Sequence, residues 1–389
     1  PRLLAASGII INVLILVFFK YSGLFAVTIL GNENEVVQLL LKMPLPLGVS
    51  FYTFQAISML ADSKKEGTKI KPVDIFLYLG FFPNSVSGPI IKYSDFNSQR
   101  KQKNFLDIDF VKVTKLLLTG YFLKVCVADN IQNYTFVLKE TNFEGYSPIY
   151  LIVIVYAYAI QIFADFAGYS LIAIGLGRMF GYVLPDNFNY PYISKSITEF
   201  WRRWHISLSS WLRQYIYIPL GGNRKGIIRT YINLMIVMLV GGLWHGSEWK
   251  YLFWGGIHGL LLVLERIYKN LKKKSTETNV LVSGIKILFT FTIVSWLWLF
   301  FEMDSVSNII MISKQIVFGW DIARDFNFAQ LFMAVVYMVP VIIYHMIYVL
   351  QSRGKWFAGD GWKMPIYALM ILALCVNRGT ESAFIYFQF

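Results

Sequence analysis

Apolar runs long enough to cross a lipid bilayer recur along this sequence, and they constrain its fold more than any other feature. A membrane-spanning helix needs about 20 predominantly apolar residues. Runs that are shorter can be re-entrant or packed inside the protein. We expect membrane-embedded helices over residues 3–29, 47–61, 73–83, 110–128, 149–164, 168–181, 229–246, 249–267, 282–302, 329–350 and 364–376.

The composition supports a lipid environment. Of the 389 residues, 56% are hydrophobic and 15% are charged, whereas soluble domains carry about 25% charged residues. We therefore predict an all-α, polytopic integral membrane protein with about 9–11 membrane-embedded helices, some of them short or re-entrant. The chain begins at Pro1 and its first apolar run follows at once. We expect a single membrane domain over residues 1–389 that lacks a native N-terminal segment.

The formal net charge of +13 comes from basic residues that lie mainly between the apolar runs, at 64–65, 69–71, 101–103, 224–229 and 269–274. This distribution is typical of cytoplasmic loops, and anionic lipid headgroups of the bilayer are its simplest partner. No nucleic-acid-binding motif accompanies the charge. Loop charges place the loops after residue 267 and at 351–363 in the cytoplasm, and the loop at 303–328 outside. The region of His245 then lies deep in the membrane or towards its outer side.

Residues 196–215 differ from a spanning helix. The spacing of Ser196 and Glu199 is that of a capping box, which predicts a helix start at Ser196. From there, aromatic and leucine side chains recur every three or four residues and form one stripe, with arginines beside it. This pattern indicates a helix in the membrane interface, and an amphipathic anchor without chemistry explains it equally well. The stripe comprises Trp201, Trp204, Leu208, Trp211 and Tyr215, and the arginines are Arg202, Arg203 and Arg213.

The chain has four histidines, and an ionisable side chain within an apolar run is a functional candidate because it is costly to bury. His345 has no polar neighbour in sequence, so we interpret it as a hydrogen-bonded packing residue. His258 is flanked by glycines and is interpreted as a hydrogen-bonding residue at a close helix contact. His205 borders the aromatic stripe. Because no two histidines lie at helical spacing beside a carboxylate, we expect no metal site.

His245 is the strongest candidate for chemistry. It lies in a Gly-Gly-Leu-Trp-His-Gly-Ser segment, between two expected helices. The glycines permit close approach of a substrate, and Trp244 supplies an apolar wall. A neutral imidazole there could accept a proton from a sugar hydroxyl. We also include Asn233 among the expected substrate-binding residues.

Three long motifs are specific: the segments 199–213 (EFWRRWHISLSSWLR), 215–226 (YIYIPLGGNRKG) and 242–246 (GLWHG). Supporting stretches occur at residues 48–55, 81–83, 88–89, 161–169 and 188–192. Together they resemble the bacterial alginate O-acetyltransferase branch of the membrane-bound O-acyltransferase (MBOAT) family. The resemblance implies helices around a central tunnel, with the family's invariant histidine at His245 and its second polar position at His205.

The resemblance also implies an activity. A multi-pass protein of the bacterial cytoplasmic (inner) membrane would transfer an acetyl group from a cytoplasmic thioester donor to hydroxyls of an extracytoplasmic polysaccharide. The donor would be acetyl-CoA or an acyl carrier, with no bound cofactor, and a periplasmic or extracellular protein would assist the transfer. His245 would be the general base and His205 would orient a substrate or stabilise charge. Trp201, Trp204, Trp244 and Asn233 would bind substrate. The three arginines would hold a phosphate-bearing donor, or form a solvated cationic face.

Two alternatives stay open at this point. The related branch that helps to attach D-alanine to teichoic acids shares the implied architecture, although its tryptophan-rich segment is less similar to this one. A non-catalytic transporter of glycan or acyl groups would also use glycines, broken helices and a central histidine.

Overall fold

The computed structural model describes residues 2–31, 33–44, 46, 48–67, 70–85, 88–271, 279–321, 328–352 and 361–380. Across these ranges the chain forms helices and no strands. In chain order they are α1 (Arg2–Leu30), α2 (Glu35–Lys42), α3 (Val49–Glu66), α4 (Pro72–Leu79), α5 (Phe82–Ser85), α6 (Tyr93–Ser98), η1 (Phe105–Asp107), α7 (Phe110–Tyr121), η2 (Phe122–Ala128), α8 (Asp129–Thr135), η3 (Phe136–Lys139), α9 (Pro148–Met179), η4 (Pro191–Ile193), α10 (Ile197–Arg203), α11 (Ile206–Leu212), η5 (Arg213–Tyr217), α12 (Ile227–His245), α13 (Trp249–Leu271), α14 (Val280–Leu297), α15 (Leu299–Glu302), α16 (Val306–Phe318), η6 (Gly319–Asp321), α17 (Phe328–Ser352) and α18 (Lys363–Val376).

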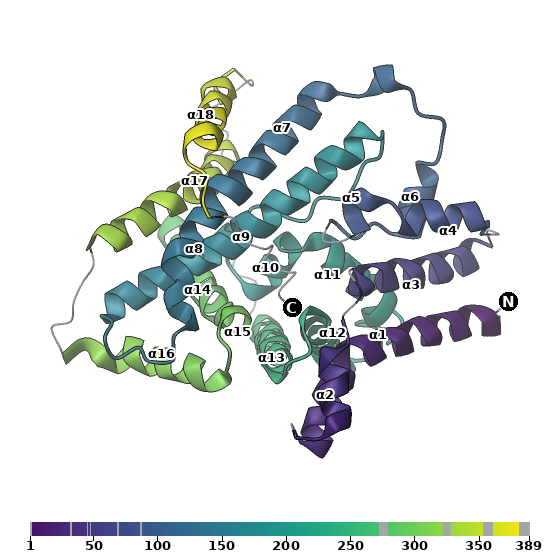
Figure 1. Cartoon of the computed structure of the whole chain (residues 1–389), viewed down its shortest axis with the longest axis horizontal. Coiled ribbons are helices and arrows are strands. Elements are labelled where there is room, and N and C mark those ends of the chain that lie inside the picture. Colours follow the sequence, from purple (N-terminus) through teal and green to yellow (C-terminus); the bar gives the residue numbers. More distant parts are fainter. Residues whose placement is uncertain are drawn as a thin grey trace.

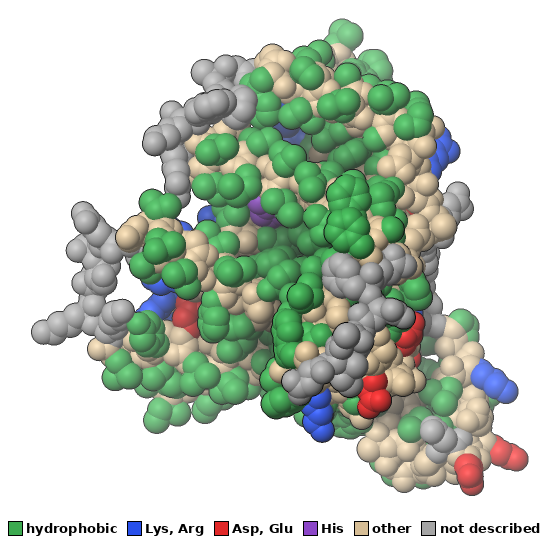
Figure 2. Space-filling view, turned by 90° about the vertical axis from the view of Figure 1, so that its left-hand side faces the viewer, with side chains coloured by type: hydrophobic (Ala, Val, Ile, Leu, Met, Phe, Trp, Pro, Cys, Tyr) green, Lys and Arg blue, Asp and Glu red, His purple; other side chains and the backbone are tan. Residues whose placement is uncertain are grey.

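Five of the described helical segments are long and apolar enough to cross a bilayer: Leu3–Leu30, Pro148–Met179, Ile227–His245, Val280–Glu302 and Phe328–Ser352. Hydrophobic side chains also dominate the molecular face shown in Figure 2. The prediction of an all-α membrane protein is therefore confirmed. The total of 9–11 embedded helices and the central tunnel stay predictions.

Two expected boundaries are wrong. The separate helices expected at 149–164 and 168–181 are one continuous helix, α9, because nothing between them breaks the helix. The stretch 303–328, expected as a loop, contains the helix α16, whose N-cap Ser305 accepts a hydrogen bond from the backbone N–H of Asn308. Residues 272–274, 324–325, 353, 355 and 360 carry charges used for the predicted orientation, and they lie outside the described residues. The orientation therefore stays a prediction.

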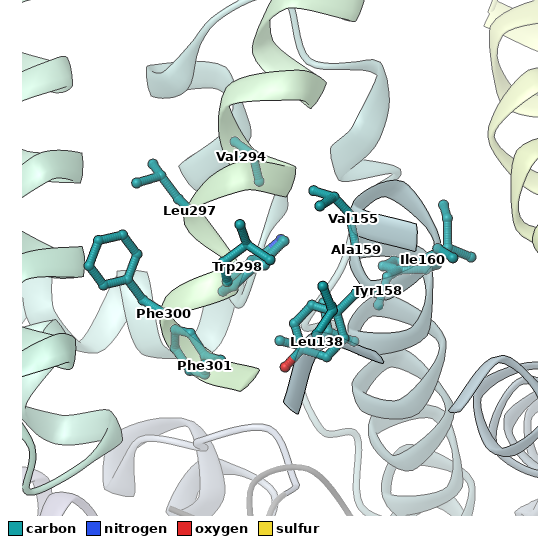
Figure 3. Packing of buried hydrophobic residues seen from close by; sticks show 14 of the residues in the cluster. Leu138, Val155, Tyr158, Ala159, Ile160, Val294, Leu297, Trp298, Phe300 and Phe301 are labelled. Carbon is teal, nitrogen blue, oxygen red and sulfur yellow. The ribbon is translucent and has the colours of Figure 1, made fainter. Parts of the chain in front are cut away.

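Helix α9 is the centre of the fold. It packs against α7, η2, α8, α14, α16 and α17, and it runs beside α7 in Figure 1. Glycines permit the close contact with α7, since a Cβ added to Gly168 would lie 2.7 Å from the carbonyl oxygen of Gly120. On another side, Trp298 and Phe301 pack towards Val155 and Tyr158 of α9 (Figure 3).

A buried charge cluster joins α9 to the neighbouring helices. The ammonium group of Lys124, in the π-helix η2, lies 2.8 Å from carboxylate oxygens of both Asp129 and Asp165. The side chains of the two aspartates are 7% and 2% exposed. Charges removed from water need such partners, because an isolated buried carboxylate is very costly. The cluster therefore holds α8 and α9 in register around η2.

Replacing Lys124 by methionine should destabilise the protein strongly. The substitution keeps a long apolar side chain but leaves two buried carboxylates without their cation, which costs about 3–5 kcal/mol. Thermal unfolding in detergent, followed by tryptophan fluorescence, measures the loss. Lys269→Met is the matched control, because Lys269 pairs with Glu265 on an exposed part of α13 and such pairs contribute at most about 1 kcal/mol. Equal losses in the two variants would contradict the assignment.

Candidate active site

The tryptophan-rich segment is two short helices, and the single interfacial helix expected over 196–215 is wrong. Ser196 does cap a helix start, since its side chain accepts a hydrogen bond from the N–H of Glu199. Helix α10 then ends at Arg203, and α11 begins at Ile206. Between them, His205 has φ 43° and ψ 53°, a left-handed conformation that interrupts the helix. The stripe expected from regular helical spacing therefore does not form.

The loop before α10 holds this junction in place. The backbone carbonyl of Asn187 accepts a hydrogen bond from the N–H of Ile206 (2.9 Å), and the N–H of Asn189 donates to the carbonyl of Arg203 (2.9 Å). A non-glycine residue in the left-handed region costs about 1–3 kcal/mol and persists where the surroundings over-determine it. These contacts on both sides of His205 supply that constraint.

The side chain of Asn187 also determines which ring nitrogen of His205 carries the proton. Its Oδ1 accepts hydrogen bonds from the N–H and the hydroxyl of Ser207 (3.4 and 2.6 Å), and its Nδ2 donates to Ser170. Because a backbone N–H can only donate, this contact fixes the amide orientation. Nδ1 of His205 lies 3.3 Å from the same Oδ1, so Nδ1 carries the proton. Burial lowers the pKa of His205 to about 3, so the ring is neutral and Nε2 is an acceptor.

His245 is the last residue of α12 and is 4% exposed. Its ring centroid lies 6.5 Å from that of His205. The rings of Trp244, Trp254 and Phe301 lie 5.0–5.2 Å from it. The two histidines predicted to act together are thus neighbours inside an aromatic enclosure. His245 there could exchange a proton with a substrate that reaches it.

A glycine contact between α12 and α13 brings Trp254 next to His245. A Cβ added to Gly242 would lie 2.2 Å from the carbonyl oxygen of Tyr251, and one added to Gly255 would lie 2.3 Å from that of Met238. The two helices can approach this closely because both positions lack side chains.

Two residues of α1 hold the end of α12. Lys20 and Tyr21 are buried, although most of α1 is exposed. The Lys20 ammonium group donates to the carbonyl of Trp244, and the Tyr21 hydroxyl donates to that of Leu243. The last carbonyls of a helix have no partner within the helix and carry partial negative charge. A cation and a hydroxyl donor therefore stabilise the turn that carries His245.

The three expected tryptophans lie in the aromatic region around the two histidines. Trp244 lies against both histidines, with its ring 5.8 Å from that of His205. Trp201 donates its indole N–H to Nδ1 of His258 (3.3 Å). Trp204 is buried and packs on Trp298, with the ring centroids 4.7 Å apart. These tryptophans belong to the same aromatic region.

Among the expected polar residues, Arg203 and Asn233 bind groups other than the two histidines. Arg203 forms an ion pair with Glu199 (3.0 Å) and donates to the carbonyl of Asn189, while Arg202 and Arg213 are exposed. Asn233 is buried and donates to the carbonyl of Gly222 (2.9 Å), which anchors the glycine turn. Substrate contacts of these residues stay predictions.

His345 and His258 both hydrogen-bond within the protein, as expected. Nδ1 of His345 contacts the carbonyl oxygen of Val341 (2.8 Å), one turn earlier in α17. In the ranges that the structure describes, no group of three or more His, Cys, Asp or Glu side chains could hold a metal ion.

Sequence reasoning missed Asn187, Lys20 and Tyr21. The lysine offered a signal, because it is an ionisable residue inside an apolar run, like the histidines. Asn187 offered none, since its loop contacts His205 only through the tertiary fold.

Comparisons with known proteins show what the chain is similar to. The sequence model of the membrane-bound O-acyltransferase family matches residues 8–303. The probable alginate O-acetylase AlgI of Azotobacter vinelandii is 36% identical over 336 residues, which cover 83% of this chain and 65% of that protein. The peptidoglycan O-acetyltransferase of Helicobacter pylori is 33% identical over 349 residues (81% and 65%). The teichoic acid D-alanyltransferase of Bacillus subtilis is 28% identical over 262 residues (63% and 65%). The chain therefore spans less than two thirds of the length of these relatives.

The contacts of Lys20 and Tyr21 should stabilise the last turn of α12. Lys20→Met should leave the Trp244 carbonyl without its buried donor and destabilise the protein by about 1–3 kcal/mol, and Tyr21→Phe should act in the same direction. Thermal unfolding measures the first effect, and faster hydrogen exchange at residues 242–245 reports loosening of the last turn of α12. Lys42→Met on the exposed end of α2 should change neither quantity. Unchanged exchange in both α1 variants would show that α1 does not hold the site.

Proposed function

Because this chain belongs to the membrane-bound O-acyltransferase family, we propose that it transfers an acetyl group from a thioester donor to hydroxyl groups of a polysaccharide. The observation that carries the proposal is the pair of buried histidines, His205 and His245, inside one aromatic enclosure. Two similar proteins support the acetyl group and the glycan acceptor, because they are named as an alginate O-acetylase and a peptidoglycan O-acetyltransferase.

In the proposed reaction His245 is the general base. It takes the proton of the acceptor hydroxyl, whose oxygen attacks the carbonyl carbon of the thioester. The surrounding rings of Trp244, Trp254 and Phe301 exclude water, which protects the thioester from hydrolysis. The thiolate then leaves with the proton that His245 holds.

His205 has a complementary role. Its neutral ring presents Nε2 as an acceptor, because Asn187 holds the proton on Nδ1. An acceptor nitrogen suits a hydroxyl group, which can donate to it, and is unsuited to a negatively charged oxygen. His205 therefore orients the acceptor glycan through a neighbouring hydroxyl in this proposal, because the single proton of the attacking hydroxyl goes to His245. The stabilisation of negative charge belongs to other residues.

The wider setting is part of the proposal. The donor is acetyl-CoA or an acyl carrier on the cytoplasmic side of a bacterial inner membrane, and the acceptor polysaccharide lies outside. A tunnel through the membrane lets them meet at His245, and a periplasmic or extracellular protein completes the transfer. D-alanyl transfer to teichoic acid is the second candidate, favoured by the similarity to the Bacillus subtilis D-alanyltransferase.

The test is acyl transfer by the purified full-length protein in detergent, with radiolabelled acetyl donors and glycan acceptors. His245→Gln should lower kcat by at least about 100-fold, because general-base catalysis contributes 10²–10⁴-fold. His345→Gln is the matched control and should retain activity, since His345 bonds to the backbone of its own helix.

Other outcomes reject the proposal in distinct ways. Wild-type rates in His245→Gln would remove this histidine from the mechanism. Transfer of D-alanine without transfer of acetyl would establish the second candidate. Flux of glycan or acyl groups across vesicles without any group transfer would establish a transporter.

A further inference from the structure

A third histidine, His258, has its tautomer fixed by a neighbour. The indole N–H of Trp201 donates to its Nδ1 at 3.3 Å. An indole nitrogen can only donate a hydrogen bond, so Nδ1 of His258 is the acceptor and carries no proton. His258 is completely buried, and a buried imidazole without an anionic partner is neutral. Its proton therefore lies on Nε2, which is a hydrogen-bond donor.

This donor and a second one beside it have no acceptor among the residues that the structure describes. They are Nε2 of His258 and the indole Nε1 of Trp254, which is 1% exposed. A buried donor left without an acceptor costs about 1–3 kcal/mol, and such groups are rare in native proteins. Because Trp254 also contacts His245, this pair of donors indicates a binding site for an oxygen atom of a substrate at His245.

The position of the pair connects it to His245. Trp254 and His258 lie one turn apart on α13, on the same side of the helix, with ring centroids 4.8 Å apart. Trp254 also lies 5.2 Å from the ring of His245. The ring of Trp254 thus borders the enclosure of His245 and the ring of His258 lies beside it, whereas His205 offers an acceptor to the same enclosure.

We propose that His258 and Trp254 bind the carbonyl oxygen of the acyl group and stabilise the negative charge that develops on it. This inference rests on the proposed acyl transfer and adds His258 and Trp254 to its catalytic residues. Donors that are already in place at a developing oxyanion, in a site without water, make one of the largest contributions to acyl-transfer catalysis.

The acceptor hydroxyl gives its proton to His245, its oxygen forms a bond to the carbonyl carbon, and the π electrons of the carbonyl move onto its oxygen. That oxygen accepts hydrogen bonds from Nε2–H of His258 and Nε1–H of Trp254. When the carbonyl re-forms, the carbon–sulfur bond breaks, and the thiolate takes the proton from His245.

Kinetics of the full-length protein with a labelled acetyl thioester test the assignment. His258→Phe and Trp254→Phe keep an aromatic ring and remove one donor each. Each should lower kcat by about 10²–10³-fold with little change in KM, as the loss of one oxyanion donor does. His258→Gln retains a side-chain N–H donor of similar reach and should recover most of the lost rate.

Trp298→Phe is the matched packing control. Trp298 is also fully buried with an indole N–H that lacks a described acceptor, and it packs on Trp254 at 5.7 Å. It should lose stability as Trp254→Phe does, yet keep kcat within about 5-fold of wild type. If His258→Phe and Trp254→Phe keep wild-type kcat while His245→Gln is inactive, the inference fails and the proposed function stands. If the wild-type protein transfers no acyl group, the proposed function itself fails.

A measurement without turnover tests the tautomers. The protein has four histidines, so ¹⁵N-histidine labelling gives a spectrum that His258→Phe assigns by the loss of one residue's signals. We expect protonated Nε2 for His258 and protonated Nδ1 for His205. A protonated Nδ1 in His258 would overturn the inference, whatever the kinetics.

Discussion

The hydrogen bonds of Asn187 at the junction of α10 and α11 are the constraint on which the site depends. They hold His205 in a left-handed backbone conformation, and they leave its Nε2 as an acceptor. Without this junction a single helix would continue through the segment and direct His205 elsewhere. The left-handed backbone of His205 costs a few kcal/mol at most, and it fixes the orientation of the His205 ring.

The rest of the fold brings other helices to this junction. α9 supports it from behind, since Phe166 packs on the ring of His205 (4.7 Å) and Ser170 binds Asn187. The close contact of α12 with α13 then places His245 and Trp254 on the opposite side. The contact between α12 and α13 depends on two positions that lack side chains, Gly242 and Gly255.

The interior also contains buried cations, and polar groups of neighbouring helices bind them. Lys124 binds two aspartates, and Lys20 binds the carbonyl end of α12, so the cations described inside the protein have defined acceptors. Because no water competes in an apolar interior, such contacts are directional constraints as well as stabilising ones. In both places the acceptors lie on a different helix or helical segment, so a charge in one apolar run fixes another.

The sequence was sufficient for the membrane class, for most helix positions and for the family. Long apolar runs indicate directly that the chain is embedded in lipid, and the motif around His245 is specific to the family. The break at His205 could not be predicted, because regular spacing of Trp201, Trp204 and Trp211 also suits one continuous helix. What ends α10 is a loop from an earlier part of the chain, in which the backbones of Asn187 and Asn189 bind Ile206 and Arg203. The continuity of α9 was missed for the opposite reason, since Asp165 and Gly168 resemble a helix boundary when their partners are unknown.

His205 and His258 are neutral in opposite tautomers, and this suits chemistry in an apolar interior. Asn187 makes His205 an acceptor and Trp201 makes His258 a donor, so the two rings differ in function without differing in charge. A charged imidazole in this interior would need a counter-ion or water to stabilise it. Neutral rings with fixed tautomers avoid that need in the resting enzyme. Only His245 then becomes charged in the proposed reaction, and it does so while the oxyanion beside it carries the opposite charge.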